Sequence, residues 1–207
     1  MPTCNVKSPL SADPNKRCFK VDDTHRFNMA MQNPVSVKGC DWTFSYWFMS
    51  ALNGTANSGT DWAFVYSNRG DSAFEVDTDH RWDAGMSCIP TFGYYTRPWK
   101  TKVCDQSWHQ IMLCHLASTN MLYGFVDGNL ENVVTGDGSI TGTSVAIGGY
   151  SAERNYYTEG YLDDMYLIKD TCLHTESFKL DTIYATDLLN TRKTWYDVPS
   201  KKLYGFK

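Results

Sequence analysis

An acidic pair inside an apolar, aromatic run decides the fold: Glu159-Gly160-Tyr161-Leu162-Asp163-Asp164-Met165-Tyr166-Leu167-Ile168. The residue types around this pair favour a β-strand. Side chains alternate between the two faces of a sheet, so Asp163 and Asp164 must point in opposite directions. One carboxylate therefore points into the protein, where backbone N–H groups or a cation have to satisfy it. The alternative is an edge strand on which both carboxylates reach water.

Length and composition fit an all-β domain. The chain has 207 residues, 14% of them aromatic, with 13 Tyr and 7 Trp. A single β domain of this size is ordinary, and aromatic residues are enriched in strands and on binding surfaces. The net charge is −4 and Lys and Arg form no long block, so nucleic acid is not expected as a partner.

The seven cysteines are scattered, and none of them forms a C-x-x-C pair. Their odd number and spacing predict neither a complete set of disulfides nor a zinc site. The first residues lack an apolar signal region, and no apolar run is long enough to cross a bilayer. We therefore expect synthesis in the cytoplasm with free, mostly buried thiols.

The pattern along the chain predicts three parts. Residues 1–17 are polar and contain three prolines, which favours an extended arm. Residues 18–175 alternate short aromatic or β-branched runs with turn signals, which predicts an antiparallel β-sandwich. Residues 176–207 are predicted to begin with a short helix and to end in a tail whose apolar residues dock on another surface. Strands are expected near 18–21, 27–29, 42–49, 62–66, 73–78, 108–116, 121–126, 143–149 and 160–169, with an Asp127-Gly128 turn.

Six motifs follow one another in a fixed order. They are Phe19-Lys20-Val21-Asp22, Trp42-Thr43-Phe44-Ser45-Tyr46-Trp47, Trp108-His109-Gln110-Ile111, Phe125-Val126-Asp127-Gly128, Ala146-Ile147-Gly148-Gly149 and Gly160-Tyr161-Leu162-Asp163-Asp164. This series resembles the laminin-G-like jelly rolls of the concanavalin A-like lectin/glucanase superfamily over roughly residues 18–175. The resemblance implies a jelly-roll fold. It implies no single function, because the superfamily includes lectins, adhesion modules, glycosidases and virion proteins.

Glycoside hydrolysis is the catalytic hypothesis. Glu75, Asp77 and Asp79 alternate along one predicted strand and would lie on one face. Retaining glycosidases place two carboxyl groups about 5 Å apart. The spacing resembles the E-x-D-x-E pattern of the glucanase branch, except that the third acid is Asp and lies near the strand end. A solvated strand face beside a turn is the favoured alternative.

Calcium is the only metal with a candidate site. Asp22, Asp23, Asp163 and Asp164 would supply carboxylate oxygens if the first and last strands of the sandwich pair, as they do in related jelly rolls. The favoured alternative is that Asp163 accepts hydrogen bonds from loop N–H groups. The five histidines show no ligand spacing, and His109 is interpreted as a packed strand residue.

Aromatic residues in predicted loops form a candidate ligand surface. Flat apolar rings with polar rims suit the C–H faces of sugars. The candidate ligand-binding residues are Trp82, Tyr94, Tyr95, Trp99, Tyr156 and Tyr157. The alternative is that these rings pack under long loops or against a partner protein.

These observations favour a non-enzymatic, lectin-like protein that binds carbohydrate or a host-surface receptor. The absent signal peptide, free thiols and apolar tail also fit a bacteriophage virion protein of the decoration or fibre kind. In that setting the termini would attach to other virion or assembly proteins. The glycosidase that uses Glu75, Asp77 and Asp79 is the alternative function.

Overall fold

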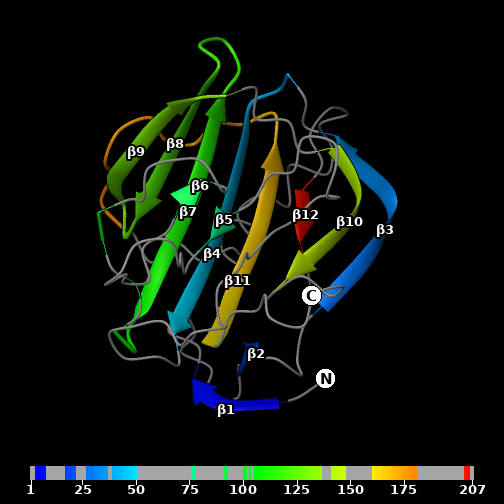
Figure 1. The fold of residues 1–207 in the computed structure, drawn as a ribbon, viewed down its shortest axis with the longest axis vertical. Coiled ribbons are helices and arrows are strands. Elements are labelled where there is room, and N and C mark those ends of the chain that lie inside the picture. The colour runs from blue at the N-terminus through cyan, green and yellow to red at the C-terminus, as the bar shows by residue number, and fades with distance from the viewer. Residues whose placement is uncertain are drawn as a thin grey trace, which may run out of the picture.

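The computed structural model describes residues 3–7, 17–21, 27–36, 39–50, 76–77, 91–92, 100–101, 103, 105–136, 141–147, 160–180 and 203–205. All regular structure in these ranges is β (Figure 1). The strands are β1 (Thr3–Lys7), β2 (Arg17–Val21), β3 (Phe27–Ser36), β4 (Trp42–Ser50), β5 (Val76–Asp77), β6 (Thr91–Phe92), β7 (Trp108–Leu116), β8 (Met121–Val126), β9 (Asn129–Thr135), β10 (Thr141–Ile147), β11 (Gly160–Lys169) and β12 (Leu203–Gly205). The predicted all-β, antiparallel class is confirmed.

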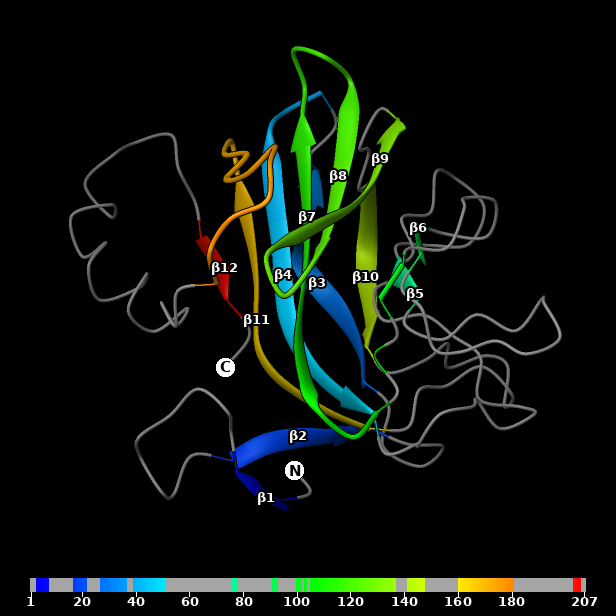
Figure 2. The same ribbon diagram turned by 90° about the vertical axis from the view of Figure 1, so that its left-hand side faces the viewer.

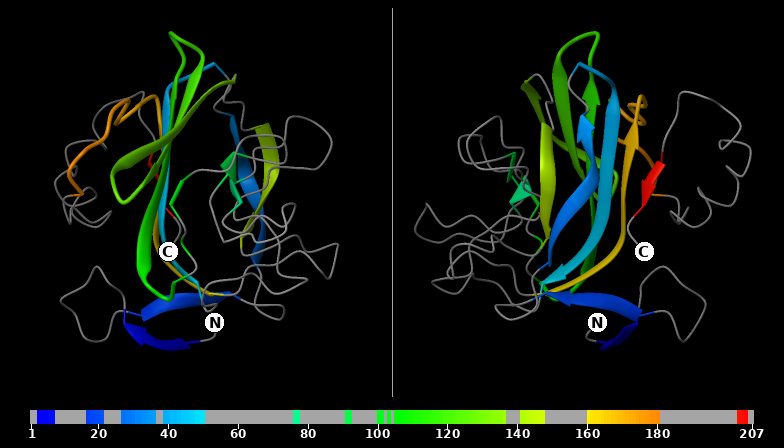
Figure 3. Two further views of the ribbon diagram at one scale, coloured as in Figure 1. Left: turned by 60° about the vertical axis from the view of Figure 1, so that its left-hand side comes forward. Right: turned by 90° about the vertical axis from the view of Figure 1, so that its right-hand side faces the viewer.

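Eight of the described strands form one antiparallel sheet. Its order is β1-β2-β11-β4-β7-β8-β9, and β12 also pairs with β11. Strands β10 and β3 form a second, two-stranded sheet, and β5 pairs with β6. Figures 2 and 3 show β10 and β3 on one side of the large sheet and residues 171–180 on the other. The large sheet is therefore covered on both faces.

The acidic stretch lies inside the large sheet. One edge of β11 pairs with β2 and β12, and the other pairs with β4. Asp163 is 5% exposed, so one of the two neighbouring carboxylates does point into the protein. The edge-strand alternative is wrong. The pairing of β2 with β11 also confirms that the first and last strands of the predicted sandwich lie side by side, with Tyr161 opposite Lys20.

Strand β4 supplies the centre of the core. Trp42, Phe44, Tyr46 and Phe48 share one face by alternation and are at most 4% exposed. The opposite face is fully buried at Thr43 and Ser45 and half-buried at Trp47 and Met49. The second face is buried because residues 171–173 run across it and hydrogen-bond to Thr43.

The chain termini contribute strands that the sequence pattern did not predict. Part of the predicted arm forms β1, which pairs with β2. Part of the predicted docking tail forms β12, which pairs with residues Tyr166–Ile168 of β11. The tail thus contacts this chain's own sheet. Residues 176–180 are not helical, and the rest of the predicted C-terminal helix lies outside the described residues.

Two expectations about composition can be compared with the described ranges. There, no helix is long and apolar enough to cross a membrane. Cys18, Cys40, Cys114 and Cys172 form no disulfide, and two of them, Cys18 and Cys114, are buried. Free thiols were expected for all seven. Cys4 lies in β1 without a described side chain, and Cys88 and Cys104 lie outside the described residues.

Candidate functional site

A tight turn places the first functional carboxylate. Asp127 and Gly128 connect β8 to β9 with φ values of +51° and +78°. A two-residue hairpin turn of this hand matches the twist of the strands it joins, and glycine adopts its second position without strain. The Asp127 N–H donates to the Gln110 carbonyl over 2.9 Å, and the Asp127 carboxylate accepts the Gln110 N–H over 2.8 Å. The side chain is therefore fixed against β7.

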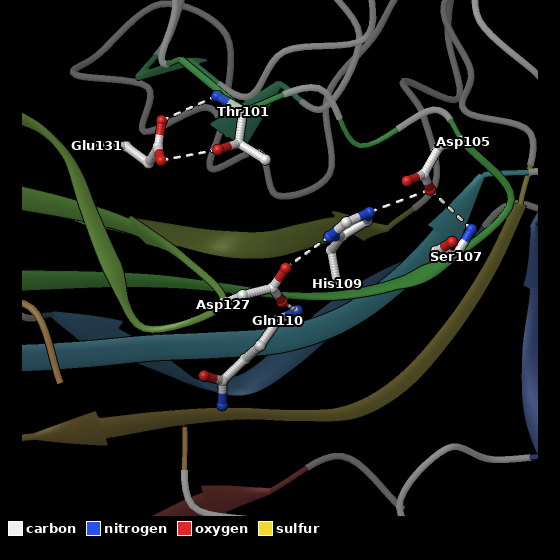
Figure 4. Close-up of polar contacts among 7 residues, drawn as sticks. All are labelled: Thr101, Asp105, Ser107, His109, Gln110, Asp127 and Glu131. Carbon is white, nitrogen blue, oxygen red and sulfur yellow. Dashed lines mark hydrogen bonds and ion pairs between the residues drawn. The ribbon is translucent and has the colours of Figure 1, made fainter. Parts of the chain in front are cut away.

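Asp127 and Asp105 hold the ring of His109 between them (Figure 4). His109 Nδ1 lies 2.7 Å from Asp127 Oδ2, and Nε2 lies 3.1 Å from Asp105 Oδ1. The same Asp105 oxygen accepts the Ser107 N–H over 2.8 Å. The exposed fraction is 12% for the His109 side chain, 51% for Asp105 and 33% for Asp127. We call these three residues the carboxylate–imidazole cluster.

The cluster favours a charged ring. Both ring nitrogens face carboxylate oxygens, and both can donate only when the imidazole is protonated. The hydrogen bond to Asp127 is the main reason that the pKa of His109 is raised above its ordinary value, and it outweighs the opposing effect of burial. Burial acts to raise the pKa of Asp105, but the bonds from Ser107 and His109 lower it overall. The geometry of the cluster therefore favours the protonated form of His109 between the two carboxyl groups.

The pH dependence of stability tests this protonated form. A group whose folded pKa exceeds its unfolded value of about 6.5 stabilises the fold fully below that pH and less as pH rises through the folded pKa. We expect His109→Gln to lower the free energy of unfolding by about 1–2 kcal/mol at pH 6 and by less at pH 9. Thermal unfolding of both proteins across this range measures the difference.

Taking the difference in stability between the wild-type protein and His109→Gln removes the contributions of other titrating groups. Burial lowers the pKa of His174, which gives a pH dependence of the opposite sign. Both proteins keep His174, so its effect cancels in the difference. A stability gap that stays constant or widens as pH rises would show that His109 is not charged in the folded protein.

A third carboxylate, that of Glu131, holds the backbone at Lys100 and Thr101. Glu131 on β9 accepts the backbone N–H groups of Lys100 over 2.6 Å and Thr101 over 2.9 Å, and the Thr101 hydroxyl over 2.8 Å (Figure 4). Val103, two residues further on, is fully buried. Three donors to one carboxylate and a buried valine fix the backbone of residues 100–103 against β9.

The chemistry open to the cluster is hydrogen bonding. Each nitrogen of His109 already faces a carboxylate, so a protonated ring has no lone pair for a metal or for general-base catalysis. The remaining acceptor sites of Asp105 and Asp127 are partly exposed and suit donors such as hydroxyl groups. No three His, Cys, Asp or Glu side chains in the described part of the chain could together hold a metal ion.

The sequence-predicted residues are only partly placed. The six candidate ligand-binding residues Trp82, Tyr94, Tyr95, Trp99, Tyr156 and Tyr157 lie outside the described residues, and so do Asp22 and Asp23 of the calcium hypothesis. Asp163 is buried, and Asp164 lies in β11 without a described side chain. The calcium site stays a prediction, whereas the strand pairing that it assumed is confirmed.

Of the three acids in the catalytic hypothesis, only Asp77 lies within the described residues. Asp77 lies in β5 opposite Thr91 of β6, so a strand does occur within the acidic run. Its side chain is not described, and Glu75 and Asp79 lie outside the described residues. Hydrolysis therefore stays a prediction.

Sequence reasoning missed the carboxylate–imidazole cluster. It interpreted His109 as a packed strand residue, and it identified Asp127 only as part of a turn. A signal was present in the hairpin register. The predicted strands 108–116 and 121–126 are symmetric about the loop between them, so their continuation places residue 110 opposite residue 127. The spacing of Asp105 and His109 across a turn was a second signal.

No protein-family model matches the sequence, and no curated protein is similar to it. Solved structures do match. Domain 4 of AbnA, an extracellular GH43 arabinanase from Geobacillus stearothermophilus solved with arabinotriose, has a TM-score of 0.51 at 10% identity and covers 79% of this chain and 75% of that one. Mouse laminin alpha1 domains LG4-5 have a TM-score of 0.47 at 16% identity, and the match covers 82% of this chain and 49% of the laminin chain.

A third match is the CBM40 domain of the Ruminococcus gnavus IT-sialidase, solved with α2,3-sialyllactose. It has a TM-score of 0.46 at 10% identity and covers 73% of this chain and 94% of that one. At these identities the likeness is one of fold. The protein therefore has the concanavalin A-like jelly-roll β-sandwich fold that the sequence resemblance implied.

Proposed function

We propose that the protein is a non-enzymatic carbohydrate-binding domain whose site includes the carboxylate–imidazole cluster. The observation that carries the proposal is the pair of partly exposed carboxylates, Asp105 and Asp127, each of which lies against one nitrogen of the His109 ring. Sugar hydroxyl groups are donors that such carboxylates accept at little cost in side-chain entropy, because the carboxylates are already ordered.

The position of the cluster supports the proposal. The backbone N–H of Lys100 is bound by Glu131 on β9, the strand that begins directly after the Asp127-Gly128 turn. Trp99 precedes Lys100 in the sequence. Carbohydrate sites combine acceptors for hydroxyl groups with flat aromatic faces for C–H groups. The arabinotriose bound by the AbnA domain is an example of a sugar ligand on this fold.

Binding to a glycan array tests the proposal. We expect the wild-type protein to bind at least one glycan, with Asp105→Asn raising its Kd about fivefold to tenfold through the loss of one charge-assisted hydrogen bond. Trp82→Ala and Trp99→Ala should each weaken binding by about tenfold or more. Glu176→Gln is the matched control, because Glu176 is an exposed acid on residues 171–180, across the sheet.

Three outcomes would contradict the proposal. They are no binding on a broad array, binding that Asp105→Asn leaves unchanged, and equal losses in Asp105→Asn and Glu176→Gln. The same glycans also test the hydrolase. Release of reducing sugar by wild type, abolished by Glu75→Gln, would favour catalysis by the acidic run over simple binding. Display on a virion surface stays a prediction from the sequence, and gene neighbours that encode capsid or tail proteins would support it.

A further inference from the structure

A buried hydroxyl fixes residues 171–173 across the large sheet. Thr43 Oγ1 donates to the Thr171 carbonyl over 2.9 Å and accepts the Leu173 N–H over 3.0 Å. Thr43 is fully buried, so both backbone groups depend on it for satisfaction. Cys172 lies between these two anchored residues. Its backbone is therefore held directly above Thr43 of β4.

A second cysteine lies beside the same hydroxyl. Cys114 of β7 is the register partner of Thr43, and its Sγ lies 3.4 Å from Thr43 Oγ1. Cys114 and Cys172 belong to one apolar cluster with Met112, Phe125 and Leu173. The Cys172 thiol donates to the His174 carbonyl over 3.6 Å, and neither cysteine forms a disulfide. One thiol therefore lies beside the Thr43 hydroxyl, and the other lies between the two residues that this hydroxyl anchors, which favours a link between them.

We propose that Cys114 and Cys172 are a redox pair that oxidises to a disulfide and so links β7 covalently to residues 171–180. Cys18 and Cys40 lie elsewhere in the fold. Cys18 lies in β2, and Cys40 lies before β4, where the charged neighbours that act on it are Lys169, Asp170 and Asp41. The pair is thus distinguished by its shared apolar cluster and by the Thr43 anchor.

The reaction needs a disulfide oxidant, RS–SR, such as oxidised glutathione. Cys172 is half-buried and Cys114 fully buried, so the oxidant reaches Cys172 first. The Cys172 thiolate, having lost its proton to solvent, attacks one sulfur of the oxidant and releases RS⁻. The Cys114 thiolate then attacks Cys172 Sγ and releases a second RS⁻. Two protein thiols become one disulfide, and the two protons appear on two molecules of RSH.

The pKa values of the pair indicate which step of the exchange is slow. Burial acts to raise the pKa of Cys114, but hydrogen bonds from Cys172, Thr43 and the backbone of His174 and Leu173 lower it overall. The bond to Cys114 and burial raise the pKa of Cys172. Cys114 is therefore the thiol of the pair that ionises more readily. Attack of Cys172 on the oxidant is the slower step, and it speeds up as the pH rises.

The link would reach the carboxylate–imidazole cluster through residues 171–180. His174 stacks on Phe178 with ring centroids 3.7 Å apart, and Phe178 packs edge-on against Phe125 at 5.5 Å. The Phe178 N–H donates to the Gly128 carbonyl over 2.8 Å, and Leu130 donates to Ser177 Oγ over 2.9 Å. Oxidation would therefore brace the turn that carries Asp127, whether or not that turn binds glycan.

Oxidation of the full chain tests the proposal. Folded protein is incubated with oxidised glutathione, digested without reduction and mapped by mass spectrometry. We expect a peptide containing Cys114 linked to one containing Cys172, and a rise in Tm of roughly 5–15 °C that dithiothreitol reverses. Cys172→Ser should lose both effects, and the matched variant Cys40→Ser should keep them.

The peptide map decides the outcome independently of variant folding. A map of oxidised wild-type protein in which Cys172 carries only glutathione, or is joined to another cysteine, would overturn the proposal. So would a Cys114–Cys172 link without any rise in Tm, because the segment would then not be restrained by it.

Discussion

We expect Gly128→Ala to lower the free energy of unfolding by about 2–4 kcal/mol, the sum of two penalties. Gly128 has a φ of +78°, where an alanine is strained, and an added Cβ would lie 2.3 Å from the backbone oxygen of Phe178. The blocking atom belongs to the main chain, so relief requires residues 171–180 to move off the β8–β9 turn. Thermal unfolding should show a fall in Tm of roughly 5–15 °C.

Gly39→Ala is the matched control for this experiment. Gly39 has a similar φ of +70°, but an added Cβ would meet no atom within 4 Å. This variant keeps the backbone strain and lacks the collision, so it should lose only about 1–2 kcal/mol. Equal losses in the two variants would contradict the contact between the turn and Phe178. If the alanine at position 128 displaces the turn, Asp127 moves away from His109. The part of the stability that depends on the titration of His109 should then become smaller.

The second large effect is expected from Thr43→Val. Valine has nearly the shape of threonine, so packing is retained while the Thr171 carbonyl and the Leu173 N–H lose their partner in a buried site. An unsatisfied buried backbone group costs about 1–3 kcal/mol. We expect a loss of about 2–4 kcal/mol in denaturant unfolding, with little change in the m-value.

Two controls isolate the hydroxyl of Thr43. Thr43→Ser keeps the hydroxyl and loses a methyl group, which should cost only about 1 kcal/mol. Ser45→Ala removes a buried hydroxyl from the same face of β4 that has no hydrogen-bond partner in the described structure, so it should be close to neutral. A Thr43→Val protein as stable as Thr43→Ser would show that residues 171–173 are not anchored by this side chain.

The local sequence pattern was sufficient to predict strand bounds where apolar and polar residues alternate clearly and a turn follows. The predicted bounds of β7, β8 and β11 match the structure, and the Asp127-Gly128 turn is confirmed. Strand β9 was not predicted because Asn129–Thr135 lies at the end of the sheet and has exposed or half-buried residues throughout, without a marked apolar face. The polar strand β1 was missed for a similar reason: its pairing with β2 is not visible in its composition.

The carboxylate–imidazole cluster shows the limit of local reasoning. Asp105, His109 and Asp127 come from a turn, a strand and a hairpin loop, and their meeting depends on the β7–β8 register. The sequence ranked aromatic residues first as ligand contacts because ring shape suits sugars. It gave no comparable weight to His109, because Asp127 is distant in the sequence and Asp105 is separated from the histidine by a turn.

By itself, the sequence determined an all-β chain, the acidic strand β11 and the tight turn at Asp127-Gly128, whereas the jelly roll was implied by the resemblance of its motif series. These follow from the period of the side chains and from the conformational freedom of glycine, which are properties of short segments. Only the tertiary structure decided that both faces of β4 are buried, that His109 lies between two carboxylates and that Cys114 meets Cys172. Each of these depends on which distant segments pack together, and the free energy of such packing is shared among residues that no local pattern connects.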